Sequence, residues 1–210
     1  MVQSTLHFLD ARGAFGANRM WLSRITRDAD ATVRTLIDPG PVDIAIRPGD
    51  DVIPERGLAV HSPGPGQVVL TVDPDNSEVT RNPNGALQRM IAHGMYLALR
   101  REGSGYDASL GAVMVNEGLA GHFAKMAFGA SDEPWEDALD DAEIEAQAGD
   151  ALQSWSRTDY NHGAWFHGLG RRPRWTGYTI GFRVVAAVLE REGVNAVGAL
   201  DWPAERFRPA

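Results

Sequence analysis

The sequence predicts an α+β protein, in which an N-terminal helix and a small mixed or antiparallel sheet pack on a mainly helical C-terminal part. Two patterns predict this class. Between residues 42 and 73 apolar residues tend to alternate with polar ones, as in half-buried strands, whereas elsewhere they recur every third or fourth position, as in helices. The 210 residues are 43% hydrophobic, enough for one core. We therefore expect a single domain, 1–210, made of the helix and sheet (1–80) and the helical part (81–210).

The first helix is predicted at 17–36, where apolar residues fall at helical intervals with charged residues between them. The Pro and Gly of "IDPGP" end it. "VDIAIRP" at 42–48 then alternates apolar and polar residues, as a half-buried strand does. Two more strands are predicted at 58–62 and 67–73, joined by a Pro/Gly turn.

Helical patterns fill the rest of the chain. The turn "NPNG" at 82–85 precedes a helix within 86–103, which ends in basic residues followed by glycine. A second helix, about 108–128, is apolar on almost every side, so its few polar residues need partners. An acidic exposed helix is predicted within 133–155, and an amphipathic one at 175–193.

Composition excludes several classes of function. The net charge of −8 and the pI near 5.2 argue against nucleic acid as a partner, because such sites need clustered cations. There is no cysteine, so any metal must be held by His, Asp or Glu. No window approaches the roughly 20 apolar residues of a membrane span, and the N-terminus lacks a secretion signal. We expect a cytoplasmic protein with no membrane partner.

The helix within 86–103 carries one histidine, His93, in an apolar setting. Zinc peptidases place two histidines at i and i+4 on one helix face, with a glutamate between them that activates the zinc-bound water. Here "HGMYL" places Gly94 at the position of the glutamate and Leu97 at that of the second histidine. One of three essential groups is present, and a single histidine in such a helix is most often a core residue.

The wider pattern, however, is informative. The segments concerned are, in chain order, VDIAIRP, HSPGPGQVVLTVDP, MIAHGMYLALRREG, NEGLAGHFAKMAFG, PWEDAL, YNHGAWFHG and PRWTGYTIGFRVV. They resemble a family of bacterial predicted zinc-dependent proteases, long classed as a domain of unknown function, with a zincin-like (gluzincin-type) fold and a helix carrying HEYHH. The resemblance covers most of the chain, and NEGLA and WTGYTIG are its most specific segments.

The resemblance implies that His93 matches the first histidine of the motif and that Glu117 matches the glutamate that supplies the third ligand. Glu117 follows Leu97 by twenty residues, the separation expected of such zincins. Leucine cannot coordinate zinc, and glycine cannot accept a proton. Loss of a general base costs roughly 10²-fold to 10⁴-fold in rate. We therefore expect a degenerate site without normal turnover and without a firmly bound cofactor, with zinc as the alternative.

Other histidines are candidates for a replacement ligand. His122 lies about 140° around the helix from Glu117, so the two side chains should diverge. His61, His162 and His167 lie on predicted connections, from which they could approach the first histidine of the motif. We take His61 or His162 as the third ligand of a rebuilt site.

Aromatic segments allow two interpretations. The resemblance implies that Tyr160, His162 and Tyr178 line the cleft and stabilise an oxyanion. Alternatively, the aromatic side chains of these segments are packing residues whose hydroxyl groups bond to the backbone. The residues concerned are Trp165, Phe166, Trp175 and Tyr178.

Two further features bear on binding. By resemblance, "HSPGPG" forms the rim of an edge strand beside the cleft, where an extended peptide pairs through backbone hydrogen bonds. Gly94 costs about 1 kcal/mol relative to alanine within a helix, which hints at a role. Its missing side chain leaves space beside His93 for a small ligand or a backbone, although drift explains the glycine equally well.

Three hypotheses follow. The first is a zincin-fold pseudo-peptidase that binds an extended peptide or protein partner in the cleft without hydrolysing it. In the second, a structural or interaction domain, His93 and Glu117 form a buried hydrogen-bonded pair. The third is an active zinc enzyme with a rebuilt site. Its ligands would be His93, Glu117 and one of His61 and His162, with Tyr178 or Tyr160 as proton donor.

Overall fold

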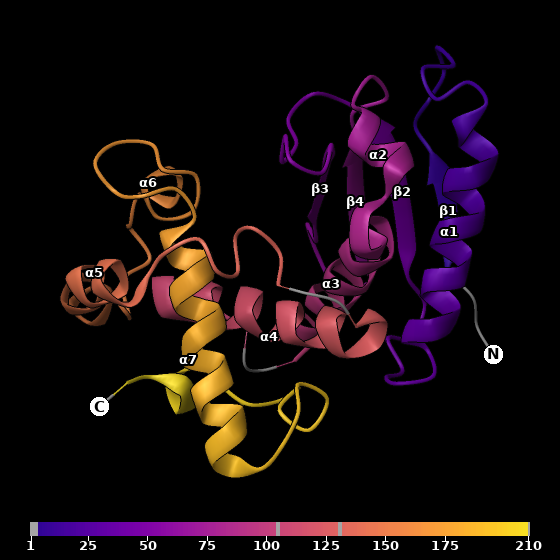
Figure 1. Ribbon diagram of the computed structural model, residues 1–210. Helices are drawn as coiled ribbons and strands as arrows, with labels where there is room; N and C mark the ends of the chain where they lie inside the picture. Colours follow the sequence, from indigo (N-terminus) through magenta and orange to yellow (C-terminus); the bar gives the residue numbers. More distant parts are fainter. Residues whose placement is uncertain (1–3, 104–105, 130–131, 210) are drawn as a thin grey trace. The chain divides into compact units, whose positions relative to one another are not determined.

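The structure is a computed structural model that describes residues 4–103, 106–129 and 132–209 (Figure 1). Within these residues the chain forms seven α-helices and one mixed sheet of four strands, which confirms the predicted α+β class. In the described ranges, none of the helices combines the length and the apolar character that a membrane crossing requires.

The chain divides into two compact units. Unit 1 comprises Met1–Glu102 with Phe123–Ser131, and unit 2 comprises Gly103–His122 with Asp132–Ala210. The predicted boundary near residue 80 therefore lies some way before the division between the units. That the whole chain is one zincin-like domain stays a prediction.

Unit 1 contains the sheet. Its elements are β1 (Thr5–Phe8), α1 (Asn18–Val33), β2 (Asp43–Pro48), β3 (Leu58–His61), β4 (Gln67–Val72), α2 (Ser77–Arg81), a 3-10 turn at Pro83–Gly85 and α3 (Ala86–Arg100). The strand order is β1-β2-β4-β3, with β1, β2 and β4 parallel and β3 antiparallel to β4. The predicted strands and helices of this region are confirmed, and β1 is an additional edge strand.

The core of unit 1 lies between the sheet and its helices. Alternate strand residues are buried, with Ile44 opposite Val68 and Ile46 opposite Leu70, all at most 1% exposed. This is the expected burial of every second residue in a strand. Helix α3 packs against β3, β4 and α1, and almost all of its side chains are buried. The helix that carries the degenerate motif is thus the central element of the unit.

A buried ion pair fixes the start of the sheet to α1. The Arg34 Nε donates to Asp30 Oδ1 at 2.8 Å, and both side chains are 9% exposed. The hydroxyl of Ser4, one residue before β1, donates to the same carboxylate at 2.7 Å and accepts from Arg34 Nη2 at 2.9 Å. Buried charges are tolerated only when they are paired in this way, so β1 is held firmly at the edge of the sheet.

Unit 2 is helical. Its elements are most of α4 (Leu110–Phe128), α5 (Asp141–Gln153), α6 (His162–Phe166), α7 (Thr176–Glu192) and a 3-10 turn at Ala204–Phe207. Helix α5 begins later than predicted because Asp140 forms a capping box with Glu143. The short α6 begins after Asn161, whose side chain accepts from the N–H of Ala164 at 3.0 Å.

Candidate functional site

The degenerate motif lies in the middle of α3, against the sheet. A Cβ atom on Gly94 would lie 2.6 Å from Val60 Cγ2 and 2.8 Å from Val68 Cγ1, closer than carbon atoms can approach. The space that the missing side chain leaves is therefore filled by β3 and β4. This packing is a structural reason for a glycine in a helix interior, where it otherwise costs about 1 kcal/mol.

The remaining motif positions of α3 are also buried. His93 is 9% exposed and Leu97 is 6% exposed, while Tyr96 is fully buried and stacks on Phe123 with ring centroids 4.9 Å apart. Leu97 has no donor atom for a metal. The position expected to hold the second histidine is thus part of a hydrocarbon core.

Strand β3 lies at one edge of the sheet, next to α3, as the edge-strand prediction requires. The carbonyl of Gly57 accepts from Asp73 on the β4 side, whereas the carbonyl of Leu58 accepts from Ile53 on the outer side. Because backbone groups alternate in direction along a strand, the N–H and C=O of Val60 point away from β4. One stretch of β3 therefore presents a free backbone edge.

His61 ends β3. Partial burial lowers the pKa of its imidazole, and the positive charges of Arg47 and Arg101 lower it further. The ring is therefore neutral at neutral pH, the form that ligates a metal or accepts a proton. His61 and His93 belong to the same unit, and a shared metal site remains a prediction.

The candidate residues of unit 2 lie near the point where α4 and α7 touch through glycines. A Cβ on Gly118 would lie 2.5 Å from the carbonyl oxygen of Gly181, and a Cβ on Gly181 would lie 2.1 Å from that of Met114. Only glycine permits such an approach of two backbones. The crossing brings Glu117, the neighbour of Gly118, close to the residues that precede Gly181.

Two tyrosines lie within the electrostatic reach of Glu117. Burial and then the charge of Glu117 raise the pKa of Tyr178. Burial, with smaller contributions from Tyr106 and Glu117, also raises the pKa of Tyr160. Both phenols are therefore protonated at neutral pH, as a proton donor must be. Both also pack against the apolar cluster of unit 2, and Tyr178 meets Phe166 edge-on at 4.9 Å, as the packing interpretation predicts.

The charge of Glu117 also acts on His162. Its ring stacks on Phe166 at 4.5 Å, and its Nδ1 lies 3.5 Å from the Tyr160 hydroxyl. Burial and the neighbouring His167 lower the pKa of His162, against an opposing contribution from Glu117. Unit 2 therefore gathers a neutral imidazole, two protonated phenols and one carboxylate.

His122, on α4, contacts α7. Its Nε2 lies 2.9 Å from the carbonyl oxygen of Phe182, and the two rings stack with centroids 3.9 Å apart. The ring is held against α7.

The metal ligands that the resemblance implies come from both units. Among the residues that the structure describes, no group of three or more His, Asp or Glu side chains is placed to hold a metal ion. His93 lies in unit 1 and Glu117 in unit 2, so their joint ligation of a metal and their direct pairing both stay predictions. The donor set of α3 alone does not fit zinc, because a site needs three protein ligands and α3 offers one.

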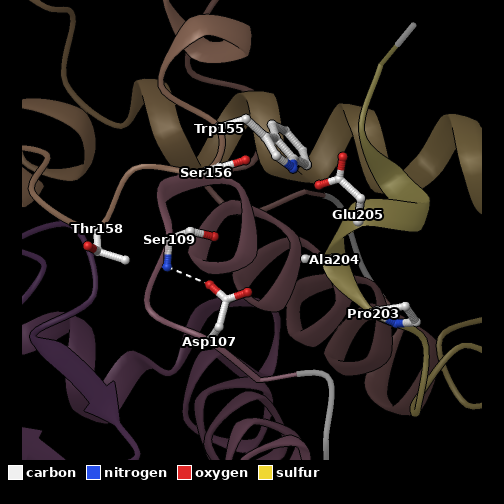
Figure 2. A pocket seen from close by; sticks show the side chains of 8 residues that line it. All are labelled: Asp107, Ser109, Trp155, Ser156, Thr158, Pro203, Ala204 and Glu205. Atoms are coloured by element: carbon white, nitrogen blue, oxygen red, sulfur yellow. Dashed lines mark hydrogen bonds between the residues drawn. The ribbon is translucent and has the colours of Figure 1, made fainter.

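A pocket that the sequence did not predict opens on unit 2 (Figure 2). Its volume is about 350 Å³, and its lining is Asp107, Ser109, Trp155, Ser156, Thr158, Pro203, Ala204 and Glu205. Its two carboxylates have partners, because Asp107 accepts from the N–H of Ser109 at 2.6 Å and Glu205 pairs with Arg208 at 3.0 Å. The lining contains no histidine and none of the predicted site residues. Its residues come from two loops and from the region of the 3-10 turn at Ala204–Phe207, which no sequence pattern connects.

Comparison with known proteins identifies the family. Residues 27–208 match the family described as predicted Zn-dependent protease (DUF2268), so the chain belongs to this family. This confirms the resemblance drawn from the NEGLA and WTGYTIG segments. Neither a curated protein nor a solved structure matches the chain significantly, so the zincin-like assignment of the fold stays a prediction.

Proposed function

We propose that this protein is a non-hydrolysing member of its Zn-dependent protease-like family, a pseudo-peptidase that binds an extended peptide along β3. The observation that carries the proposal is the packing at Gly94. The position of the general base is pressed against Val60 and Val68, so a longer side chain there would displace the sheet. The helix that should hold the catalytic groups is committed to the core.

The absence of the general base at position 94 and of the second histidine at position 97 has consequences for hydrolysis. Without a base at position 94, proton transfer from a nucleophilic water loses roughly 10²-fold to 10⁴-fold in rate. With Leu97 in place of the second histidine, a metal also loses one of the ligands that fix its geometry. The first loss falls on the chemical step and the second on metal binding. Binding of the peptide backbone depends on neither.

The free edge of β3 supports the binding part of the proposal. An extended peptide can add to an exposed sheet edge through main-chain hydrogen bonds, and Val60 offers an outward-facing N–H and C=O. The neutral ring of His61 lies at the end of the same strand. The ligand we propose is therefore an extended peptide or the extended segment of a protein partner.

A second candidate function rests on the residues around Glu117. A rebuilt zinc enzyme would use His93, Glu117 and either His61 or His162 as ligands. The observation that favours it is the neutral His162 and the protonated Tyr160 and Tyr178 within reach of the Glu117 charge. In that enzyme a tyrosine would donate the proton to the leaving group. The two candidates differ in whether peptides are cleaved.

The deciding experiment uses quenched fluorescent peptides of mixed sequence, incubated with the full chain and zinc, with and without a chelator. If the protein is a pseudo-peptidase, we expect no cleavage that the chelator abolishes. Unlabelled peptides of the same mixture should still bind to the protein and be retained by it. Cleavage that the chelator abolishes, and that Glu117→Ala removes while Glu145→Ala does not, would establish the rebuilt enzyme instead. Glu145 is a suitable control because it is an exposed carboxylate on α5.

A further inference from the structure

A second surface of unit 1 lies at the edge of the sheet formed by β1, whereas β3 forms the other edge. Two adjoining hollows of about 310 and 370 Å³ lie along α1 there, and they share Met20, Ser23 and Arg27. We call this region the α1–β1 surface. The first hollow is lined by Leu6, Phe8, Arg19, Met20, Ser23 and Arg27.

The surface is apolar where side chains of α1 and β1 meet. Met20 is 84% exposed, and Leu9, which follows β1, is 60% exposed. Leu6 and Phe8 are half-buried and line the floor of the first hollow. Large apolar side chains that gather around a hollow on an exposed surface indicate a binding site for a partner more often than scattered ones do.

The same surface is positively charged, although the chain has a net charge of −8. Arg19, Arg24 and Arg27 line the hollows and are exposed, with Asp28 as the one carboxylate among the lining residues. Arg19 lies over the ring of Phe8 at 4.7 Å. Within the described residues, neither Arg24 nor Arg27 forms an ion pair. These two cations are therefore available to an acidic partner.

The backbone of β1 adds a third feature. Thr5 and Leu9 donate their N–H groups to Val42 and Ile46 at 2.8 and 2.9 Å, on the β2 side. Because backbone groups alternate along a strand, the N–H and C=O groups of Leu6 and Phe8 point away from β2. In the described sheet no strand lies on that side. The outward groups form an unpaired edge beside the hollows.

We propose that the α1–β1 surface binds an extended acidic segment of a partner protein, which adds to β1 as a further strand. Alternate side chains of that segment would fill the hollows against Leu6 and Met20, and its carboxylates would reach Arg24 and Arg27. Charge and apolar character alone would also suit an anionic lipid surface. The unpaired strand edge distinguishes the two, because only a polypeptide satisfies outward N–H and C=O groups in register.

This site is independent of the proposed function. It lies at the other edge of the sheet from β3, and it requires neither a metal nor hydrolysis. Of its lining residues only Arg27 and Asp28 fall within residues 27–208, which the family match covers. A failure of either proposal would leave the other standing.

The test measures binding of a fluorescein-labelled peptide, blocked at both ends, in which two valines two positions apart are flanked by glutamates. Fluorescence anisotropy with the full chain should give saturable binding that weakens as salt is added, because exposed charges are screened. A peptide with lysines in place of glutamates should not bind. The glutamate peptide with N-methylated backbone nitrogens between the valines should bind at least about tenfold more weakly, because the lost N–H groups can no longer pair with β1.

A charge reversal identifies the surface. Arg27→Glu should weaken binding of the glutamate peptide about tenfold, the effect of reversing one charge-assisted contact. Arg171→Glu makes the same change of net charge at an exposed arginine of unit 2 and should leave the affinity unchanged. Circular dichroism of both variants controls for folding.

Three outcomes would overturn the proposal. Equal affinity of the N-methylated and unmodified peptides would exclude strand addition. Binding of phosphatidylserine vesicles that Arg27→Glu abolishes, with no binding of the glutamate peptide, would identify a lipid surface instead. Self-association in sedimentation velocity that Arg27→Glu abolishes, again without peptide binding, would identify a second copy of the chain as the occupant.

Discussion

Helix α3 in unit 1 and helix α4 in unit 2 each carry one residue that the family resemblance assigns to a metal site, yet their surroundings differ. Beside His93, the neighbouring motif positions contact valines and other core residues. Around Glu117, two tyrosines and a histidine lie within reach of its charge. In α3 the motif positions are used for packing, whereas in α4 Glu117 lies near side chains that can bind or release a proton.

The difference teaches that packing can take the place of a chemical group in one helix while another helix keeps a carboxylate among polar neighbours. Glycine serves packing in both helices, because Gly94 admits the sheet and Gly118 admits α7. In α3 the glycine occupies the position of the motif glutamate, so a packing contact stands where the general base would be. In α4 it is the neighbour of Glu117, so packing positions a polar group. The loss of hydrolysis that we propose therefore originates in α3.

The largest effect is expected at the crossing of α4 and α7. Gly181→Ala would place a Cβ atom against the backbone carbonyl of Met114, which cannot move without displacing its helix. We predict a loss of about 3 kcal/mol in the free energy of unfolding, at the upper end of typical overpacking costs. Urea denaturation measures it. A loss below about 1 kcal/mol would mean that the close crossing does not determine the stability of unit 2.

A smaller loss is expected at the degenerate motif. Gly94→Ala pushes a methyl group against Val60 and Val68, whose side chains can shift slightly, and it gains about 1 kcal/mol of helix propensity. We predict a net loss of about 1 to 2 kcal/mol.

The matched control is the exposed helical Gly149, where an added Cβ meets nothing within 4 Å. Gly149→Ala should stabilise the protein by about 0.5 to 1 kcal/mol. Opposite signs in the two variants support the packing account of position 94. Stabilisation by both would mean that position 94 has room for a side chain, and would remove the main support for the pseudo-peptidase.

Much of the fold could be predicted from the sequence, because hydrophobic periodicity is a local property. The helix of the motif was predicted within 86–103 and lies at Ala86–Arg100. Strand β1 was missed because it has only four residues and, unlike β3, no antiparallel neighbour joined to it by a short turn, since its parallel partner β2 lies more than thirty residues away. Helix α6, with five residues, was missed for the same reason of length.

The candidate site could be predicted only in part. The family resemblance selected His93, Glu117 and Tyr178, but composition could not show that Gly94 meets β3 and β4. That contact joins elements far apart in the chain, and a glycine in a helix carries no sign of what approaches it. The grouping of Tyr178 near Glu117 likewise depends on the close crossing of α4 and α7, which only the structure displays.

A moderate effect is expected on the pKa values of His162 and Tyr178 in unit 2. The negative charge of Glu117 favours the protonated His162 and disfavours the ionised Tyr178. Glu117→Gln should therefore lower the pKa of His162 further and also lower the pKa of Tyr178 from its raised position. Titration followed by NMR of the histidine ring protons measures the first shift. An unchanged His162 pKa would mean that Glu117 does not belong to this group.

The smallest expected effect is on the pH dependence of stability. The pKa values of His61 and His162 are lowered by burial in the folded chain, whereas an unfolded histidine titrates near pH 6.5. Below about pH 6.5 the unfolded state binds more protons, so each histidine contributes stability that is present above this pH and lost as the pH falls. In urea denaturation between pH 7 and pH 5, the free energy of unfolding should fall less steeply with decreasing pH in His61→Gln and in His162→Gln than in the unsubstituted protein. A steeper loss in either variant would contradict the direction of these shifts.

The central claim is that α3 has kept its place in the fold and lost the metal chemistry. The most direct test is elemental analysis of protein purified without chelator or metal-affinity tag, then incubated with zinc and desalted. We predict that no zinc is retained, and that Glu117→Ala gives the same result. Retention of close to one zinc per chain, lost in Glu117→Ala, would contradict the claim and show that a third ligand completes the site.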